Sequence, residues 1–222
     1  MHDSKNLRPM ADLSHWFGLL CLLIGFSGPT WAQAKTPADT TQETATASPA
    51  APGRIEVLSL YDYQDNQQLI LDARIRLSLP PAVMDALQHE IPMTFQTEIT
   101  LDESRSLLGI PYQRNRVQIR YQTRLQYYRF NQAWVLHNLR NEKVQSFSSL
   151  EEALETLGTL SGFALTNLAT LHPNTEYHMG VRMFLDRWTL PSPMMIDALF
   201  SPAWQLDSGW ESIQIQSPKS WL

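Results

Sequence analysis

Residues 114–130, RNRVQIRYQTRLQYYRF, alternate between apolar and polar side chains and predict one long β-strand. Successive side chains of a strand point to opposite sides, so one face of this strand needs a hydrophobic core. The other face carries a row of arginines, which are Arg114, Arg116, Arg120 and Arg124. Because the stretch is longer than the usual strand of about 5–6 residues, we expect a bend or a bulge where the alternation slips, at Tyr127 and Tyr128.

Similar alternation recurs before and after this strand and predicts a chain built mainly from antiparallel strands. We expect further strands at residues 54–63, 68–79, 93–102, 133–138, 143–147 and 177–185, with a last one through Ile213 and Ile215. Pro81 favours the first position of a short helix that extends to His89. Ser149 and Glu152 form a capping box, which predicts a second short helix ending near Gly158.

Residues 171–177, LHPNTEY, resemble the tyrosine corner of fibronectin type III and immunoglobulin-like sandwiches. In those folds the tyrosine hydroxyl bonds back to upstream backbone. We therefore expect Tyr177 to be buried, with its hydroxyl bonded to backbone within residues 171–175. Together these patterns predict a mainly β fold, an antiparallel immunoglobulin-like β-sandwich with two short helices.

The first 34 residues have the features of a secretory signal peptide. Basic residues precede an apolar run at residues 16–26, and small residues up to Ala34 provide a cleavage site. The run is shorter than the ~20 apolar residues of a membrane-spanning helix, and retention as an anchor is the alternative. We expect a signal peptide at residues 1–34, export to the periplasm, a disordered Thr-, Ala- and Pro-rich tether at residues 35–53, and a single domain at residues 54–222.

Charge is distributed unevenly along the chain. The whole sequence has a net charge of −5, yet residues 104–141 contain arginines and neither lysine nor acid. These arginines are at positions 105, 114, 116, 120, 124, 129 and 140. Such a segment indicates either an anionic partner or internal pairing with the acidic remainder of the chain. Cys21, the one cysteine, lies in the apolar run, so we expect no disulfide or thiol nucleophile in the mature chain.

The sequence carries no motif for a metal, a cofactor or a catalytic nucleophile. The histidines of the expected domain fall on different predicted elements and lack metal-ligand spacing; they are His89, His137, His172 and His178. There is no G-x-S-x-G motif, no phosphate-binding glycine loop and no dinucleotide fingerprint. We therefore predict no catalytic residue, no metal and no cofactor. Nucleic acid is disfavoured as a partner because the protein is acidic and is expected to be exported.

The arginine face supports two interpretations. In the first, the four arginines share one exposed face and bind the phosphates or carboxylates of a lipid headgroup, a glycan or an acidic protein. In the second, Arg120 and Arg124 form ordinary exposed pairs with Glu98 and its polar neighbours on the preceding strand. We expect a non-catalytic periplasmic binding or interaction module of the cell envelope. The alternative is an envelope hydrolase whose site is assembled from distant residues, such as His137 with Asp197.

Several sequence blocks, taken in order, resemble an exported proteobacterial family catalogued as domain of unknown function 4390. They include IPMTFQTEITL at residues 91–101, SFSSLEEALETLG at 146–158, LHPNTEYHMGVRMFLD at 171–186 and WQLDSGW at 204–210. The resemblance covers nearly all of residues 54–215. It implies no assigned activity, cofactor or catalytic residue.

Overall fold

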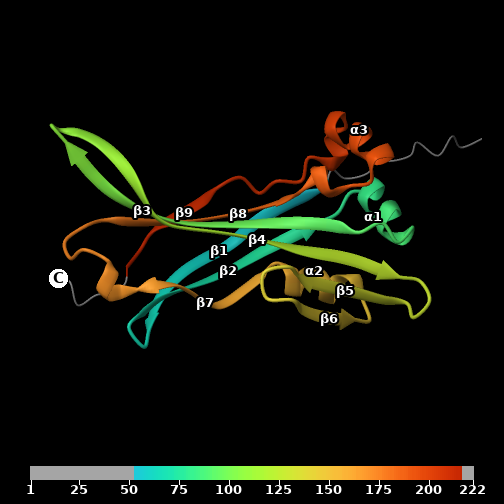
Figure 1. Ribbon diagram of the computed structural model, residues 1–222, viewed down its shortest axis with the longest axis horizontal. Coiled ribbons are helices and arrows are strands. Elements are labelled where there is room, and N and C mark those ends of the chain that lie inside the picture. The colour runs from blue at the N-terminus through green and yellow to red at the C-terminus, as the bar shows by residue number, and fades with distance from the viewer. Residues whose placement is uncertain (1–52, 217–222) are drawn as a thin grey trace, which may run out of the picture. The chain divides into compact units, whose positions relative to one another are not determined.

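The computed structural model describes residues 53–216. The predicted signal peptide, the predicted tether up to residue 52 and residues 217–222 lie outside the described residues. Within the described range the chain forms two antiparallel sheets and three short α-helices (Figure 1). The prediction of a mainly β, antiparallel fold with two sheets is confirmed, and a third α-helix joins the two that the sequence predicts.

The smaller sheet has three strands in the order β1-β2-β7, which are Arg54–Asp65, Gln68–Ser78 and Thr159–Asn167. Asn66 and Gln67 join β1 to β2 with positive φ angles of 44° and 62°, as a tight two-residue hairpin turn requires. The sequence did not predict β7. Its pairing with β2 shifts register twice, and Gly162 interrupts it with a φ of 65°, so its side chains do not alternate regularly.

The larger sheet has six strands in the order β6-β5-β4-β3-β8-β9. In chain order they are β3 Met93–Leu107, β4 Ile110–Tyr128, β5 Ala133–Asn138, β6 Lys143–Phe147, β8 Tyr177–Leu185 and β9 Glu211–Gln214. β3 to β6 follow one another as hairpins, while β8 returns to the other edge of β3. β5 pairs with β4 only from Thr123 onward, so residues 110–121 of β4 have an open edge on that side within the described chain.

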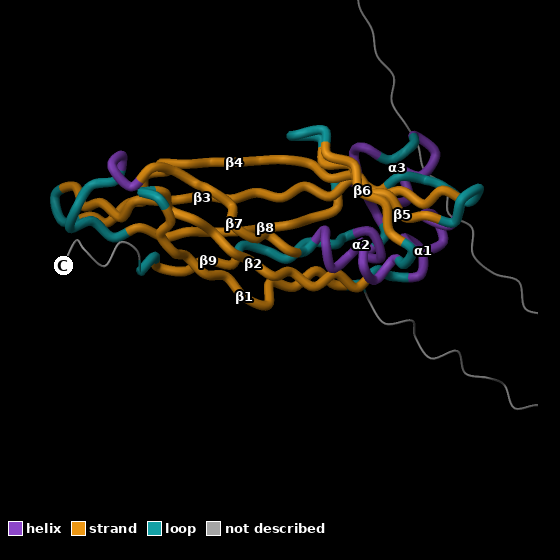
Figure 2. The backbone as a smooth tube through the Cα atoms, turned by 90° about the horizontal axis from the view of Figure 1, so that it is seen from below, coloured by secondary structure: helices purple, strands orange, loops and turns teal. Residues whose placement is uncertain are grey.

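The three α-helices lie away from the tip of the β3–β4 hairpin (Figures 1 and 2). They are α1 Pro81–Gln88, α2 Leu150–Leu157 and α3 Ser192–Phe200. Ser149 caps α2 as predicted, because its hydroxyl accepts a hydrogen bond from the backbone N–H of Glu152 at 3.2 Å. Gly158 follows α2 at a close approach, since a Cβ there would stand 1.9 Å from the carbonyl oxygen of Ile75. No helix in residues 53–216 is long and apolar enough to cross a bilayer.

The hydrophobic core lies between the two sheets, which form separate layers in Figure 2. Alternate residues of β2, β3 and β8 are buried there, among them Leu71, Ile75, Phe95, Ile99, Leu101, Val181 and Met183. Each fully buried side chain of this kind contributes about 1.5–3 kcal/mol to stability. The inward face of β4 is as predicted, because Val117, Ile119 and Leu125 oppose inward residues of β3.

The register shift of β4 lies at a different place from the predicted irregularity. β4 pairs with β5 without interruption through Tyr127 and Tyr128, so the prediction of a bulge there is wrong. The register instead shifts between Leu101 and Asp102 of β3, where β4 contributes Arg116 as an extra residue. This β-bulge reverses the inward and outward alternation of β4 before Val117, relative to a regular strand.

Candidate binding surface

The outer face of the larger sheet carries charged side chains that neutralise one another. Glu98 on β3 lies opposite both Arg120 on β4 and Arg182 on β8. The Nε atom of Arg120 is 3.0 Å from Oε1 of Glu98, as in the pairing interpretation of the sequence. Arg182 binds Asp207 through two guanidinium nitrogens, with Nε at 2.9 Å from Oδ1. Hydrogen bonding from Arg182 holds the pKa of Asp207 below its ordinary value, against the opposing effect of burial.

Arg124 lies on the same outer face, between Thr94 of β3 and His137 of β5. Its side chain is exposed. Nearby, the amide of Gln122 donates a hydrogen bond to Oδ2 of Asp186 at 3.0 Å, which continues the internal polar network of this face. Most charged side chains of the outer face therefore contact one another, whereas Arg124 on the same face is exposed.

Arg114 and Arg116 lie on the other side of the sheet, so the prediction of one face for all four arginines is wrong. The β-bulge places Arg114 opposite Glu103, an inward residue of β3. The Nη2 atom of Arg116 donates to the backbone carbonyl of Thr170, which follows β7 of the smaller sheet, at 3.1 Å. Within residues 53–216, neither arginine has an acid within ion-pair distance. The four arginines therefore form two pairs in different surroundings.

A buried carboxylate, Glu103, joins β3 to the turn before β8. Its side chain is 0% exposed, and its Oε1 atom is 2.6 Å from Nη2 of Arg105 and 3.4 Å from Nδ1 of His172. The hydroxyl of Tyr177 donates to the same oxygen at 3.3 Å and accepts from the backbone N–H of His172 at 2.8 Å. The bond between this hydroxyl and backbone lies in the turn where the sequence predicts it, and Tyr177 is buried.

Burial raises the pKa of the Glu103 carboxyl, but its neighbours outweigh that effect. Hydrogen bonding and charge from Arg105, with smaller contributions from His172 and Tyr177, hold the pKa below its ordinary value. The sequence predicts a strand that ends at residue 102, whereas β3 continues to Leu107 and keeps Glu103 on the inward side. An acid at an inward position was the signal by which the sequence could have revealed this cluster.

Past the end of β8, the β3–β4 hairpin continues as a two-stranded ribbon (Figure 1). This segment, which we call the ribbon, comprises residues 104–113. Leu108 and Gly109 form its turn with φ angles of 52° and 81°. The side chain of Leu108 is 96% exposed, and three more apolar or aromatic side chains around it are exposed, which are Leu107, Ile110 and Tyr112. Exposed apolar side chains that lie together in this way make the ribbon a candidate interaction surface.

The two faces of the ribbon differ in chemistry. Cross-strand partners share a face, so the observed register assigns each side chain to one side. One side carries Leu107, Ile110, Tyr112 and Arg105, continued by Arg114 at the base, and the other carries Ser104, Ser106, Pro111 and Gln113. Sequence reasoning missed this surface because it followed only the arginine face of residues 114–130.

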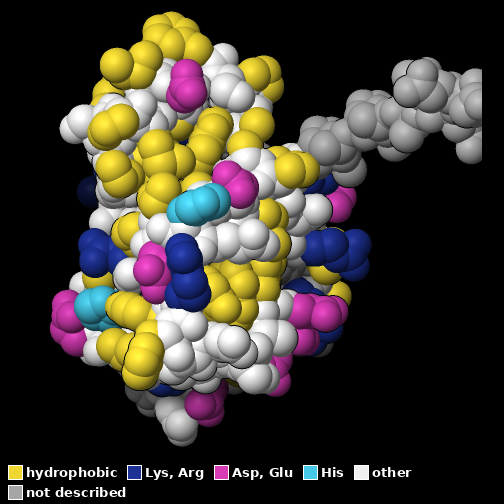
Figure 3. All heavy atoms as spheres, turned by 90° about the vertical axis from the view of Figure 1, so that its right-hand side faces the viewer, with side chains coloured by type: hydrophobic (Ala, Val, Ile, Leu, Met, Phe, Trp, Pro, Cys, Tyr) yellow, Lys and Arg dark blue, Asp and Glu magenta, His cyan; other side chains and the backbone are white. Residues whose placement is uncertain are grey.

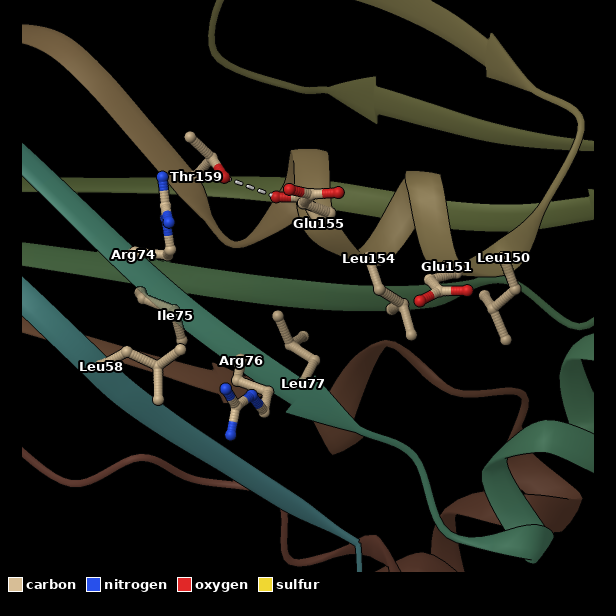
Figure 4. A pocket seen from close by; sticks show the side chains of 10 residues that line it. All are labelled: Leu58, Arg74, Ile75, Arg76, Leu77, Leu150, Glu151, Leu154, Glu155 and Thr159. Atoms are coloured by element: carbon tan, nitrogen blue, oxygen red, sulfur yellow. Dashed lines mark hydrogen bonds between the residues drawn. The ribbon is translucent and has the colours of Figure 1, made fainter.

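A groove of about 580 Å³ lies between β2 and α2 (Figure 4). Leu77 and Leu154 contribute apolar surface to it, while Arg76 of β2 and Glu151 of α2 contribute charges of opposite sign. None of the predicted site residues lines this groove.

The residues of the hydrolase alternative are not brought together. The Nε2 atom of His137 is 2.8 Å from Oε2 of Glu142 in the β5–β6 hairpin. Asp197 lies on α3, which Figure 1 places apart from β5. Within the described part of the chain, no group of three or more His, Cys, Asp or Glu side chains could hold a metal ion.

A second exposed apolar area lies on α3 and the short 3-10 helix Arg187–Thr189 before it. Trp188, Ile196 and Phe200 are exposed there. Figure 3 shows hydrophobic side chains gathered in the upper part of that end of the domain, where Figure 1 places α3. Its arginine, Arg187, is used internally, because it donates to the carbonyl of Ala198 near the end of α3 at 3.3 Å.

Comparison with known proteins identifies a family. A family model described as "Domain of unknown function (DUF4390)" matches residues 53–214, which is nearly the whole described range. Neither a curated protein nor a solved structure matches the chain.

Proposed function

We propose that this chain, which belongs to the DUF4390 family, is a non-catalytic binding module of the cell envelope. The observation that carries the proposal is the ribbon, which projects past β8 and exposes Leu108 and its apolar neighbours next to arginines. In this proposal the ribbon binds an anionic partner, and the domain acts in the periplasm after cleavage of the signal peptide.

The arginines at the base of the ribbon support an anionic partner better than those of the outer sheet face do. On the outer face, Arg120 and Arg182 already bind Glu98 and Asp207. An arginine in such a pair must give up its partner before it binds another anion. Arg114 is exposed and has no acidic partner within residues 53–216. We therefore place the binding surface on the ribbon and at its base.

The proposal of a non-catalytic module is supported by the polar side chains, which are already bound to other groups of the domain. Glu103 is the deeply buried acid of this region, and it is held by Arg105, His172 and Tyr177 in contacts that join three segments of backbone. Such contacts fit a carboxylate that fixes the base of the ribbon. His137, the residue of the hydrolase alternative, is occupied by an exposed acid of its own hairpin.

Photo-crosslinking in cells tests the proposal. A benzoylphenylalanine placed at Leu108 should capture a partner, and one placed at Val144, an exposed apolar residue of β6, should not. Mass spectrometry of the product then identifies the partner as lipid or protein. Equal crosslinking from both positions, or none from Leu108, would contradict the proposal.

The proposed location has a separate test. Mass spectrometry of the N-terminus should find a mature protein that begins at Lys35, recovered with the soluble periplasmic fraction. A chain that keeps residues 1–34 in a membrane fraction would show that the segment is an anchor instead.

A further inference from the structure

We infer that the partner of the ribbon is the surface of an anionic phospholipid bilayer, into which residues 107–110 insert while Arg114 and Arg116 contact phosphate groups. This inference rests on the proposed binding function and names its partner. It follows from the order of side chains along the ribbon, from the charges at its base and from the way the base is fixed.

The side chains of the ribbon follow the polarity gradient of a bilayer interface. The apex is Leu108, and the next cross-strand pair is Leu107 with Ile110. Tyr112 follows, and tyrosine favours the boundary between acyl chains and headgroups. At about 3.3 Å per residue, Arg114 stands about 13 Å from Ile110, beyond the depth of about 5–10 Å to which interfacial apolar side chains reach. The arginines would therefore lie at the level of the phosphates.

The charges at the base are complementary to an anionic surface. Glu103 is the nearest acid to Arg105, and it is buried and already bound. Arg114 has no acidic partner in the described chain, and Arg116 is bound only by the carbonyl of Thr170. Two acids border this area, half-buried Asp102 and exposed Glu176, and Asp102 accepts a hydrogen bond from Asn115 at 2.9 Å. The strand register places Asp102 on the face opposite to Arg114, so the guanidinium groups of Arg114 and Arg116 are left without an acidic partner within the described chain.

The ribbon is also held at its base in a fixed direction. An isolated two-stranded hairpin is only marginally stable in water. The ribbon continues from strands that pair within the sheet, and Ser104 donates its backbone N–H to the carbonyl of Glu176 at 2.9 Å. Below it, Arg105 and Tyr177 converge on Glu103. This anchoring keeps the apolar apex away from the core, where it can enter a bilayer without rearrangement of the domain.

Flotation of the purified protein with lipid vesicles tests the inference. The full mature protein should float with vesicles of equal parts phosphatidylglycerol and phosphatidylcholine, and should float at least tenfold less with phosphatidylcholine alone. The bound fraction should fall as salt is raised, because exposed charges are screened over about 8 Å at physiological ionic strength. A control without vesicles measures any aggregated protein.

Two variants assign the apolar contact to the ribbon. Leu107→Ser with Leu108→Ser should lower the partition coefficient on phosphatidylglycerol vesicles at least tenfold. The matched control, Phe130→Ser with Val144→Ser, removes exposed apolar side chains elsewhere and should leave it unchanged. Equal losses in both double variants would overturn the inference.

A second pair of variants assigns the electrostatic contact. Each arginine near an anionic membrane contributes to binding by about fivefold, so Arg114→Gln with Arg116→Gln should lower partition by about 25-fold. Arg124→Gln, an exposed arginine of the outer face, should have little effect.

The outcomes separate this inference from the proposed function. Absence of flotation with either vesicle would overturn the lipid partner. If crosslinks from Leu108 then reach a protein, the proposed binding function stands with a protein partner. If those crosslinks are also absent, both the inference and the proposed function fail.

Discussion

The two hairpins at the ends of β4 both expose an apolar side chain at the tip, but they are held differently. In the β4–β5 hairpin, Phe130 is 104% exposed. Its neighbour Arg129 is tied to the end of α1 and the residues after it, because its backbone N–H donates to Glu90 at 2.8 Å and its guanidinium donates to the carbonyl of Gln88 at 3.4 Å. The ribbon has its fixed contacts at the base, and its tip extends past the neighbouring strand.

The difference shows that exposure of an apolar side chain does not by itself identify a binding surface. Phe130 lies beside Arg129, whose hydrogen bonds are made within the domain itself. Leu108 belongs to a cluster that continues into Tyr112 and arginines on one face. The arrangement of neighbours, rather than the exposure of one residue, distinguishes the two tips.

The largest expected loss of stability comes from a substitution at the base of the ribbon. Arg105→Gln leaves the carboxylate of Glu103 buried without its main cation, so it should lower the free energy of unfolding more than any of the other changes compared below. The matched change Arg129→Gln at the other hairpin removes an exposed contact and should cost less than about 1 kcal/mol. Urea unfolding of both variants checks this. Equal losses of stability would remove the distinction between the two anchors.

The pH dependence of stability should report the same carboxylate. Because the folded protein lowers the pKa of Glu103 below 4.5, the ionised group stabilises the fold above that ordinary value. The stabilisation disappears as the pH falls through the lower pKa of the folded state. The difference in melting temperature between the protein and Glu103→Gln should therefore be full at pH 7 and shrink in strong acid. A difference that grows as the pH falls would contradict the assignment.

A smaller effect should follow from the tyrosine hydroxyl. Tyr177→Phe removes a buried group that bonds both the backbone of His172 and Glu103, so it should cost about 1 kcal/mol or slightly more. Tyr128→Phe near the other hairpin removes an exposed hydroxyl that bonds Gln126 at 3.2 Å. That control should change stability by no more than about 0.5 kcal/mol. Thermal melts that show equal shifts would contradict the structural role of Tyr177.

The smallest expected effect on stability comes from substitutions at the tips of the two hairpins. Leu108→Ser and Phe130→Ser should each change the free energy of unfolding by no more than about 0.5 kcal/mol, since both side chains are exposed. Chemical unfolding measures this directly. A large loss in Leu108→Ser would mean that the apex packs within the protein and is not a free surface.

Much of the fold could be predicted because the alternation of apolar and polar residues follows which side chains are buried. The inward set of β4, the capped helix after Ser149 and the strand that begins at Tyr177 all follow from local patterns. β7 escaped prediction because its irregular pairing and Gly162 break the alternation.

The candidate site was harder to predict because its geometry depends on one extra residue. Alternation counted through Arg116 assigns Arg114 to the outer face, whereas the bulge places it opposite Glu103. The pair of Arg120 with Glu98 belongs to one of the two interpretations of the sequence, and these residues do meet in adjacent strands. The sequence does not show, for each arginine, whether the side chain pairs within the protein or is available to an anionic partner.

The open edge of β4 has a consequence for the solubility of the folded protein. Residues 110–121 leave main-chain donors and acceptors unpaired on one side within the described chain, and such an edge can template pairing with another molecule. Pro111 removes one donor, the bulge at Arg116 twists the strand, and Arg114, which has no acidic partner in the described chain, would meet a like charge on a second copy of the same edge. The arginine-rich, acid-free composition of this edge therefore also disfavours edge-to-edge pairing between copies of the protein.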